Sequence, residues 1–253
     1  MLVVVGLVAQ ARAETRPPYG NAVEGSLLSA PVALDPAAAQ SHAEVTVVGL
    51  VFDTLYAIGP GGIEPHLAVG PPVLDPAGTT AHVVLRRGVR FHDASVMTAS
   101  DVVSSLERVR AVGWVLTPVA AVRASGDGID LTLRAPGVDV ASLLALPQTA
   151  ITRRGQAPAA AHPIGSGPFA IERLDRGGRE LALRAFDDHF AGRPYLNRLV
   201  LRWFDTPDAE ARRFETGTSQ LSARGQTVFP GATPKFQARA VESPAAVLLF
   251  VGF

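Results

Sequence analysis

Residues 91–109 read FHDASVMTASDVVSSLERV and contain the signals for the end of a strand, a turn and a helix. Phe91 closes an incoming apolar segment, and a small polar turn follows it. Thr98 and Asp101 have the spacing of a capping box, in which the acidic side chain reaches back to the start of a helix. Four apolar residues then recur at helical spacing: Val102, Val103, Leu106 and Val109. The stretch therefore predicts a helix that begins at about residue 99.

The pair His92-Asp93 inside this stretch raises the question of a catalytic or metal site. The chain has six histidines, and no two of them have the i, i+4 spacing of a helical zinc site. Asp93 is better explained as a turn residue that binds neighbouring backbone amides. We interpret the pair as the connection between a strand and a helix.

Two other segments contain residue types that are found in catalytic or metal sites. Gly165-Ser166-Gly167 lacks the G-x-S-x-G spacing of a nucleophile elbow, and Pro168 would disrupt the helix that must hold such a serine. We interpret it as a turn whose glycines adopt positive φ. Asp187-Asp188-His189 is interpreted as a solvated turn, because adjacent side chains of a strand point to opposite faces. No arrangement of residues points to catalysis, so the sequence predicts a protein that is not an enzyme.

The composition is that of a globular chain with a substantial core, because 47% of its 253 residues are hydrophobic. Lys and Arg number 23, as do Asp and Glu, so the formal net charge is zero. A neutral chain has no general electrostatic attraction for nucleic acid. The absence of cysteine excludes disulfides, thiol catalysis and cysteine-based metal sites.

The first residues, MLVVVGLVAQARAETRPP, indicate export. The apolar run is too short to span a bilayer, and Ala11-Arg12-Ala13 has the small-x-small pattern of a signal peptidase site. We expect residues 1–13 to be a signal peptide and the mature chain to be a soluble periplasmic protein. Without a cysteine to carry a lipid, it is not expected to be a lipoprotein. The alternative is that VVVGLV forms an ordinary buried strand.

The remaining apolar patterns predict mainly strands. Residues 43–58 form a long apolar segment whose β-branched residues leave helix and strand both open. Strands are expected at 25–36, 81–87, 129–133, 179–186 and 196–204, and a short helix is expected at 207–216.

The longer stretch LRRGVRFHDASVMTASDVVSSLERV, residues 85–109, resembles the signature of the family 5 extracytoplasmic solute-binding proteins. These are the peptide, dipeptide and nickel binding components of ABC importers. The family pattern is L-R-x-G-V-x-F-x-D-G followed by T-A-x-D-V, and Ala94 stands where the family usually has glycine. Further blocks resemble the family in the same order: LDP at 34–36, VFDTLYAIGPGGIEPHLAVG at 51–70, PIGSGPF at 163–169, FDDHFAGRPYLNRLVLRWF at 186–204, and ETGTSQLSARG at 215–225.

The resemblance implies an α/β fold of the periplasmic-binding-protein type II (class C) kind. It implies a main lobe from residues 14–48 and 165–253, with an inserted subdomain from residues 49–164. Family members have a second lobe, which we expect to be missing from this chain. Their ligand lies between the lobes, and closure by a hinge is what the membrane permease recognises.

The resemblance also implies where ligand would bind. Relatives contact ligand a few residues after L-D-P, which corresponds to Gln40, Ser41 and His42, and again near Ser222 and Arg224. A peptide or another small solute is the implied ligand and an inner-membrane ABC permease the implied partner. No cofactor, metal or nucleic acid is implied. An orphan lobe that no longer binds solute and serves as an interaction module is the alternative, and residues 14–253 alone are expected to bind peptides weakly or not at all.

Overall fold

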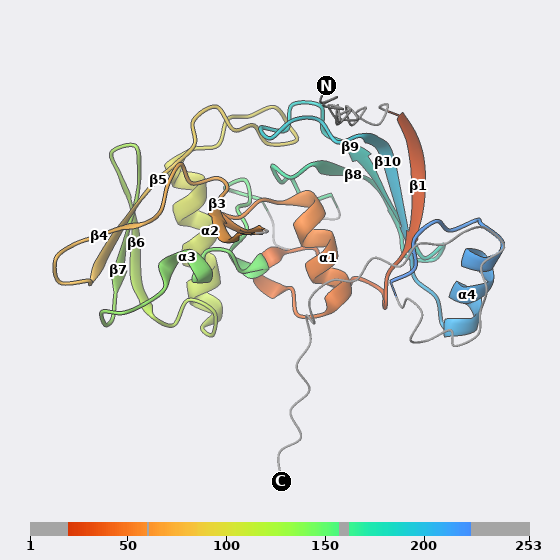
Figure 1. Ribbon diagram of the computed structural model, residues 1–253, viewed down its shortest axis with the longest axis horizontal. Helices are drawn as coiled ribbons and strands as arrows, with labels where there is room; N and C mark the ends of the chain where they lie inside the picture. The colour runs from red at the N-terminus through yellow and green to blue at the C-terminus, as the bar shows by residue number, and fades with distance from the viewer. Residues whose placement is uncertain (1–19, 60, 157–161, 224–253) are drawn as a thin grey trace, which may run out of the picture.

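The structure is a computed structural model that describes residues 20–59, 61–156 and 162–223. Two four-stranded sheets lie on opposite sides of the described structure, and helices α1 and α2 lie between them (Figure 1). Each sheet has its own cluster of buried apolar side chains. The segments that connect the two clusters therefore determine how the two halves are held together.

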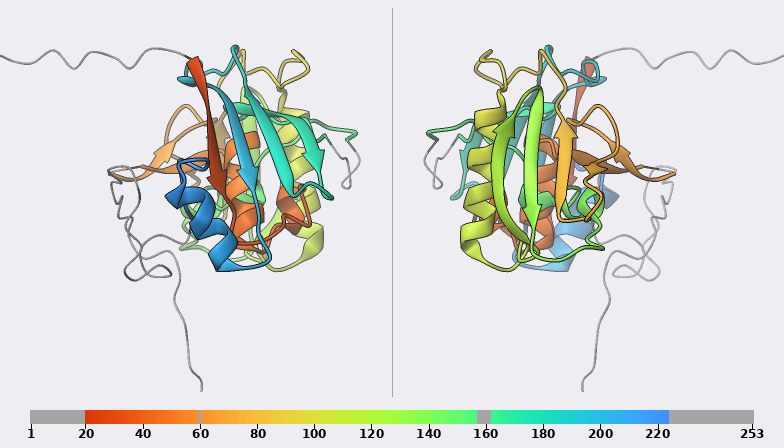
Figure 2. Two further views of the ribbon diagram at one scale, coloured as in Figure 1. Left: turned by 90° about the vertical axis from the view of Figure 1, so that its right-hand side faces the viewer. Right: turned by 90° about the vertical axis from the view of Figure 1, so that its left-hand side faces the viewer.

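The first sheet has the strand order β1-β10-β9-β8 and is mixed, because β1 runs parallel to β10 while the other pairs are antiparallel. Figure 2 (left) shows this sheet face on. Helix α1 (His42–Val51) packs its buried Val47, Val48 and Val51 into the same cluster as Leu181 and Leu199. The strands are β1 (Gly20–Ser26), β8 (Phe169–Asp175), β9 (Glu180–Ala185) and β10 (Leu196–Arg202).

The second sheet is antiparallel and has the order β4-β5-β7-β6 (Figure 2, right). Helix α2 (Ala99–Val112) contributes Val102, Leu106 and Val109 to its core, as the helical spacing predicted. The sheet contributes Ile129, Leu131 and Leu133 to the same core, where their side chains are buried. The strands are β4 (Val73–Leu74), β5 (Thr80–Val84), β6 (Val119–Ser125) and β7 (Gly128–Leu133).

Short elements complete the described chain. The hairpin of β2 (Tyr56–Gly59) and β3 (Gly62–Pro65) follows α1, and the helix α4 (Pro207–Glu215) follows β10. The remaining pieces are the 3-10 helices η1 (Pro36–Ala38) and η2 (Pro147–Thr149) and the single-turn α3 (Val140–Leu143). The helix predicted at 207–216 is thus confirmed, and Gly217 follows it with a φ of 73°.

The start of α2 confirms the prediction made from Thr98 and Asp101. A carboxylate oxygen of Asp101 accepts the Thr98 backbone N–H at 2.9 Å and the Thr98 hydroxyl at 2.5 Å. Gly113 ends the helix with a φ of 96°, a left-handed conformation that glycine adopts at little cost.

Two predictions of secondary structure need correction. The strand expected at 25–36 lies earlier, at 20–26, because the N–H groups of Val32 and Ala33 bind the Glu44 side chain instead of a neighbouring strand. Strands β3, β4, β6 and β8 were not predicted. The segment 43–58, whose sequence is compatible with both helix and strand, contains both, since α1 ends at Val51 and β2 begins at Tyr56.

Candidate ligand-binding site

The N-terminus of α1 presents three of the residues that the resemblance implied. Ser41 is the N-cap, and its hydroxyl accepts the backbone N–H of Glu44 at 3.2 Å. Gln40 and His42 on either side of it are exposed. The two exposed side chains supply donors and acceptors of hydrogen bonds, while Ser41 is committed to the helix.

Glu44 holds this end of α1 in place. Its Oε1 accepts the N–H groups of Val32 and Ala33 at 3.2 and 2.8 Å, and its Oε2 accepts those of Gln40 and Ser41 at 3.0 and 2.9 Å. Burial alone would raise the pKa of Glu44, but these hydrogen bonds to the charged form outweigh it and lower the pKa to about 2. A single buried carboxylate therefore fixes the backbone that carries Gln40, Ser41 and His42.

Ser222 lies on another part of the fold, after α4. Its hydroxyl donates to Oε1 of the buried Glu210 at 2.8 Å, and the Ser26 hydroxyl donates to the same oxygen at 2.5 Å. Ser26 in turn accepts the Ala223 N–H at 2.7 Å. The hydroxyl of Ser222 is thus engaged in anchoring this segment, and Arg224 lies outside the described residues.

The segment before Ser222 continues the first sheet. Leu221 forms a parallel bridge to Gly25 on the free side of β1, where a Cβ on Gly25 would meet Leu221 Cβ at 3.3 Å. Gln220 comes directly before Leu221. Its side-chain oxygen accepts the Glu24 N–H at 2.8 Å, so this neutral residue has a structural role at the sheet edge.

His92 connects the turn of the quoted stretch to the Gly165–Gly167 segment. Its backbone N–H donates to Gly165 O at 2.9 Å, its Nε2 lies 2.9 Å from Gly167 O, and its Nδ1 accepts the Gly165 N–H at 3.3 Å. Burial lowers the pKa of His92, so the ring favours its neutral form. Asp93 does bind the Ser95 N–H at 3.1 Å, which confirms its predicted turn role. The role of His92 was missed, because its partners are more than 70 positions away in the sequence.

The glycines at 165 and 167 are required for a reason other than the one predicted. Neither has a positive φ. A Cβ on Gly165 would lie 1.9 Å from Val51 O, and a Cβ on Gly167 would lie 2.5 Å from the Val51 carbonyl carbon. The Gly167 N–H donates to Val51 O at 3.0 Å. Two backbones are thus in direct contact here, which only glycine allows.

Asp53 is the centre of a buried polar cluster next to these glycines. Its Oδ2 accepts the Ser166 hydroxyl at 2.8 Å, and its Oδ1 lies 2.9 Å from His66 Nε2 and 3.6 Å from His189 Nε2. The predicted solvated turn at 187–189 is therefore wrong for His189, whose side chain is only 7% exposed. Burial opposes the charge of Asp53, but the two imidazoles, His189 ahead of His66, lower its pKa.

Ala94 occupies a position where its backbone has a φ of 67°. Left-handed geometry costs a non-glycine residue about 1–2 kcal/mol, which explains why the family pattern has glycine there. We expect Ala94→Gly to raise the free energy of unfolding by about 0.5–1 kcal/mol, net of the entropy that glycine adds to the unfolded chain. Urea denaturation measures this change. Ala111→Gly in α2 is the matched control and should lower stability; equal effects from both variants would contradict the prediction.

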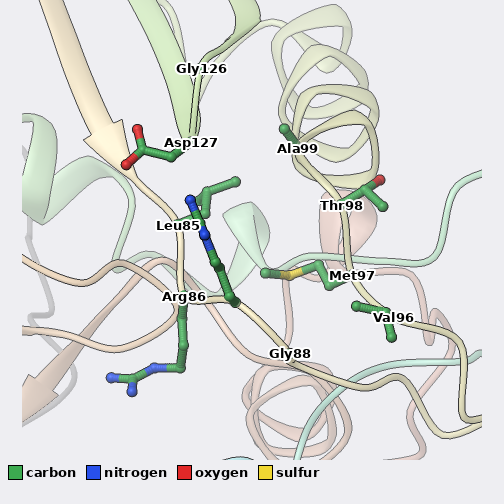
Figure 3. Close-up of a pocket in the computed structure, with 10 residues that line it drawn as sticks. Leu85, Arg86, Gly88, Val96, Met97, Thr98, Ala99, Gly126 and Asp127 are labelled. Atoms are coloured by element: carbon green, nitrogen blue, oxygen red, sulfur yellow. The ribbon is translucent and has the colours of Figure 1, made fainter.

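Two open pockets lie near these groups. One of about 240 Å³ is formed by the end of β5, the start of α2 and the β6–β7 turn, and Figure 3 shows Arg86 pointing away from Asp127 there. The Arg86 guanidinium lies over the Phe190 ring, 5.2 Å from its centroid. The other, of about 260 Å³, lies between α1 and β2 and includes Asp53 and His66. It gives water access to the edge of the Asp53 cluster.

Within the residues that the structure describes, no group of three His, Cys, Asp or Glu side chains is arranged to hold a metal ion. In the same ranges, no helix combines the length and the apolar character needed to cross a bilayer.

Comparison with solved structures places the fold. The chain is similar to the oligopeptide-binding protein AppA from Bacillus subtilis, solved in complex with a nonapeptide, with a TM-score of 0.71 and 23% identity. The match covers 81% of this chain and 44% of that one. The architecture is therefore that of an α/β periplasmic-binding-protein type II lobe.

Sequence comparison with curated proteins finds further relatives. The nickel-binding protein NikA of Staphylococcus aureus is 24% identical over 58% of this chain, and the HTH-type transcriptional regulator SgrR of Pectobacterium atrosepticum is 30% identical over 65% of it. This chain spans only 30% of the length of each. A sequence model of the protein family described as "Bacterial extracellular solute-binding proteins, family 5 Middle" matches residues 62–250, which is most of the sequence. On that match, the chain belongs to the bacterial extracellular solute-binding proteins, family 5.

Proposed function

We propose that this chain is part of the solute-binding component of an ABC importer, with peptides or related small solutes as its ligand. Membership of family 5 is the observation that carries the proposal. The likeness to an oligopeptide-binding protein in complex with a nonapeptide supports the choice of ligand. The chain acts by binding and not by catalysis, is exported to the periplasm by its N-terminal signal, and delivers solute to a permease in the inner membrane.

We further propose that the main lobe comprises residues 14–48 and 165–253, with residues 49–164 as an inserted subdomain. The two separate apolar cores support a division into two units, since one gathers around the first sheet and α1 and the other around the second sheet and α2. Val51, Phe52 and Ala150 of the proposed subdomain belong to the first core. Gln40, Ser41, His42, Ser222 and Arg224 are proposed to face ligand from the main lobe. Exposed side chains at the start of a helix suit hydrogen bonding to a peptide backbone, which lets one site accept many sequences.

The ligand face is tested by the double variant Gln40→Ala/His42→Ala. Two lost hydrogen bonds of about 0.5–1.5 kcal/mol each should weaken binding roughly tenfold. Calorimetry with a mixture of tri- to pentapeptides, on protein purified from its native host, measures this change. His162→Ala, an exposed histidine in the proposed subdomain, is the matched control. Equal affinity of the double variant and the wild type would reject these two contacts, and no binding by the wild type would favour the alternative of an orphan lobe that no longer binds solute.

The match to SgrR supports a second candidate, a ligand-sensing part of a transcriptional regulator. The two candidates differ in compartment. Finding the protein in the extracytoplasmic fraction of its host supports the importer component, whereas finding it in the cytoplasm supports the regulator.

A further inference from the structure

The cluster around Asp53 joins segments from both proposed units of the fold. Asp53 and His66 lie between α1 and β4, and Ser166 and His189 lie on either side of β8 and β9. We call this set, together with His92, the seam. Its members include a carboxylate that is 4% exposed and a histidine side chain that is 7% exposed, so their charge states affect how the segments hold together.

The position of one proton on His189 follows from its neighbours. Its Nδ1 lies 3.2 Å from Gly192 O, and a carbonyl oxygen only accepts hydrogen bonds. Nδ1 therefore carries a proton and donates it. In a neutral ring, Nε2 would then be a bare acceptor. This Nε2 faces Oδ1 of Asp53 at 3.6 Å, and among the described residues it has no hydrogen-bond partner. Two buried acceptors facing each other are unfavourable unless a proton lies between them.

His92 provides a contrast in the same seam. Its Nε2 donates to Gly167 O while its Nδ1 accepts an N–H from Gly165, so the neutral ring satisfies both partners. A second proton on His92 would point at the Gly165 N–H. The hydrogen-bond partners thus favour the neutral form of His92 and the charged form of His189.

We propose that His189 is doubly protonated in the folded protein and forms a buried imidazolium–carboxylate bridge to Asp53, a proton-dependent latch that ties the β9–β10 loop to the segments at Asp53 and Ser166. At 3.6 Å the charged ring and the carboxylate attract each other as an ion pair, at a distance longer than that of a hydrogen bond. The Asp53 carboxylate remains ionised, as its lowered pKa requires.

Several other titratable or charged groups lie near His189 and Asp53. Across the seam His66 binds the same carboxylate oxygen of Asp53, and both His66 and His189 pack against the Phe190 ring. The other groups that face the seam are Arg86 over the Phe190 ring, His92 with Arg184, and on the loop itself Asp187, paired with Arg193, and the exposed Asp188.

The latch predicts the direction in which the stability of the folded protein changes with pH. The latch requires the second proton on His189. The stabilisation is therefore present at lower pH and is lost as the pH rises and the proton leaves His189. His92 has the opposite sign, because its stabilising form is neutral and its contribution is lost as the pH falls below about 6.5.

Nitrogen NMR of the histidine rings tests the proposal on the whole labelled chain. We expect both ring nitrogens of His189 to carry protons at about pH 7.5, where an ordinary histidine is mostly neutral, with the signals assigned from their loss in His189→Gln. In Asp53→Asn the side-chain amide can donate to a neutral Nε2, so His189 should revert to the neutral form with its proton on Nδ1. His162→Gln, at an exposed histidine, should leave the His189 signals unchanged.

Two results would overturn the latch. One is a neutral His189 at about pH 7.5 in the wild type. The other is a His189 signal that changes on addition of a chelator, which would mean that a metal ion and not a proton lies between the two groups. A second measurement keeps the test decisive if Asp53→Asn does not fold. The ratio of the unfolding constants of His189→Gln and the wild type should rise at least tenfold between pH 8 and pH 6, and a constant ratio contradicts the proposal.

Discussion

Replacing Gly165 with alanine is expected to lower the free energy of unfolding by more than about 4 kcal/mol, or to prevent folding. The added Cβ would lie 1.9 Å from Val51 O and 2.7 Å from a ring carbon of Phe52. The backbone cannot move away easily, because Gly165 also accepts the His92 N–H at 2.9 Å and Gly167 donates to Val51 at 3.0 Å. Overpacking against backbone has no flexible side chain to relieve it.

Urea denaturation followed by circular dichroism measures the effect of Gly165→Ala. Gly49→Ala is the matched control, since a Cβ there would have no heavy atom within 4 Å. Gly49 lies within α1, so alanine should raise stability by up to ~1 kcal/mol. If Gly165→Ala unfolds at the wild-type urea concentration, the close contact between the two segments is not present in solution.

Replacing Glu44 with glutamine is expected to cost about 3 kcal/mol of stability. The carboxylate accepts four backbone N–H groups, two on each oxygen. The amide of glutamine has only one accepting atom, so its NH₂ would face two N–H groups that have lost their partner in a buried place. Thermal unfolding of the two proteins measures the loss, which should leave the second sheet and α2 least affected.

The Glu44 carboxylate also makes the stability of the folded protein decrease at acidic pH. The pKa of Glu44 is lowered from 4.5 to about 2 in the folded protein. Its contribution is therefore complete above pH 4.5 and is lost as the pH falls towards 2. The stability difference between wild type and Glu44→Gln should shrink over that interval. Glu172→Gln, which removes an exposed ion pair with Arg198, is the control and should change stability by less than about 0.5 kcal/mol.

Local signals in the sequence were sufficient for α2 and for the turn before it. The capping pair Thr98 and Asp101, the apolar spacing and the turn role of Asp93 each depend on residues within a few positions of one another. The β-branched residues of 43–58 did not distinguish helix from strand, because α1 ends and β2 begins inside that one apolar run.

The seam could not be predicted, because its geometry depends on contacts between distant segments. Asp53 meets Ser166 from more than 100 positions away, and no spacing rule connects His189 with either. The glycines at 165 and 167 were recognised as special, but their contact with Val51 is tertiary and not a property of the turn. For the ligand face, the resemblance to family 5 named Gln40, Ser41, His42 and Ser222. Only the structure separates the exposed Gln40 and His42 from Ser41 and Ser222, whose hydroxyls are already bound.

The parallel pairing of β1 with β10 also sets an order of events during folding. Gly20 pairs with Leu196, whereas β5, β6 and β7 pair with one another within a much shorter stretch of chain. Short loops close at a smaller entropic cost than long ones. The second sheet can therefore form while β1 still has an unpaired edge, and the first sheet is completed last, as β10 arrives.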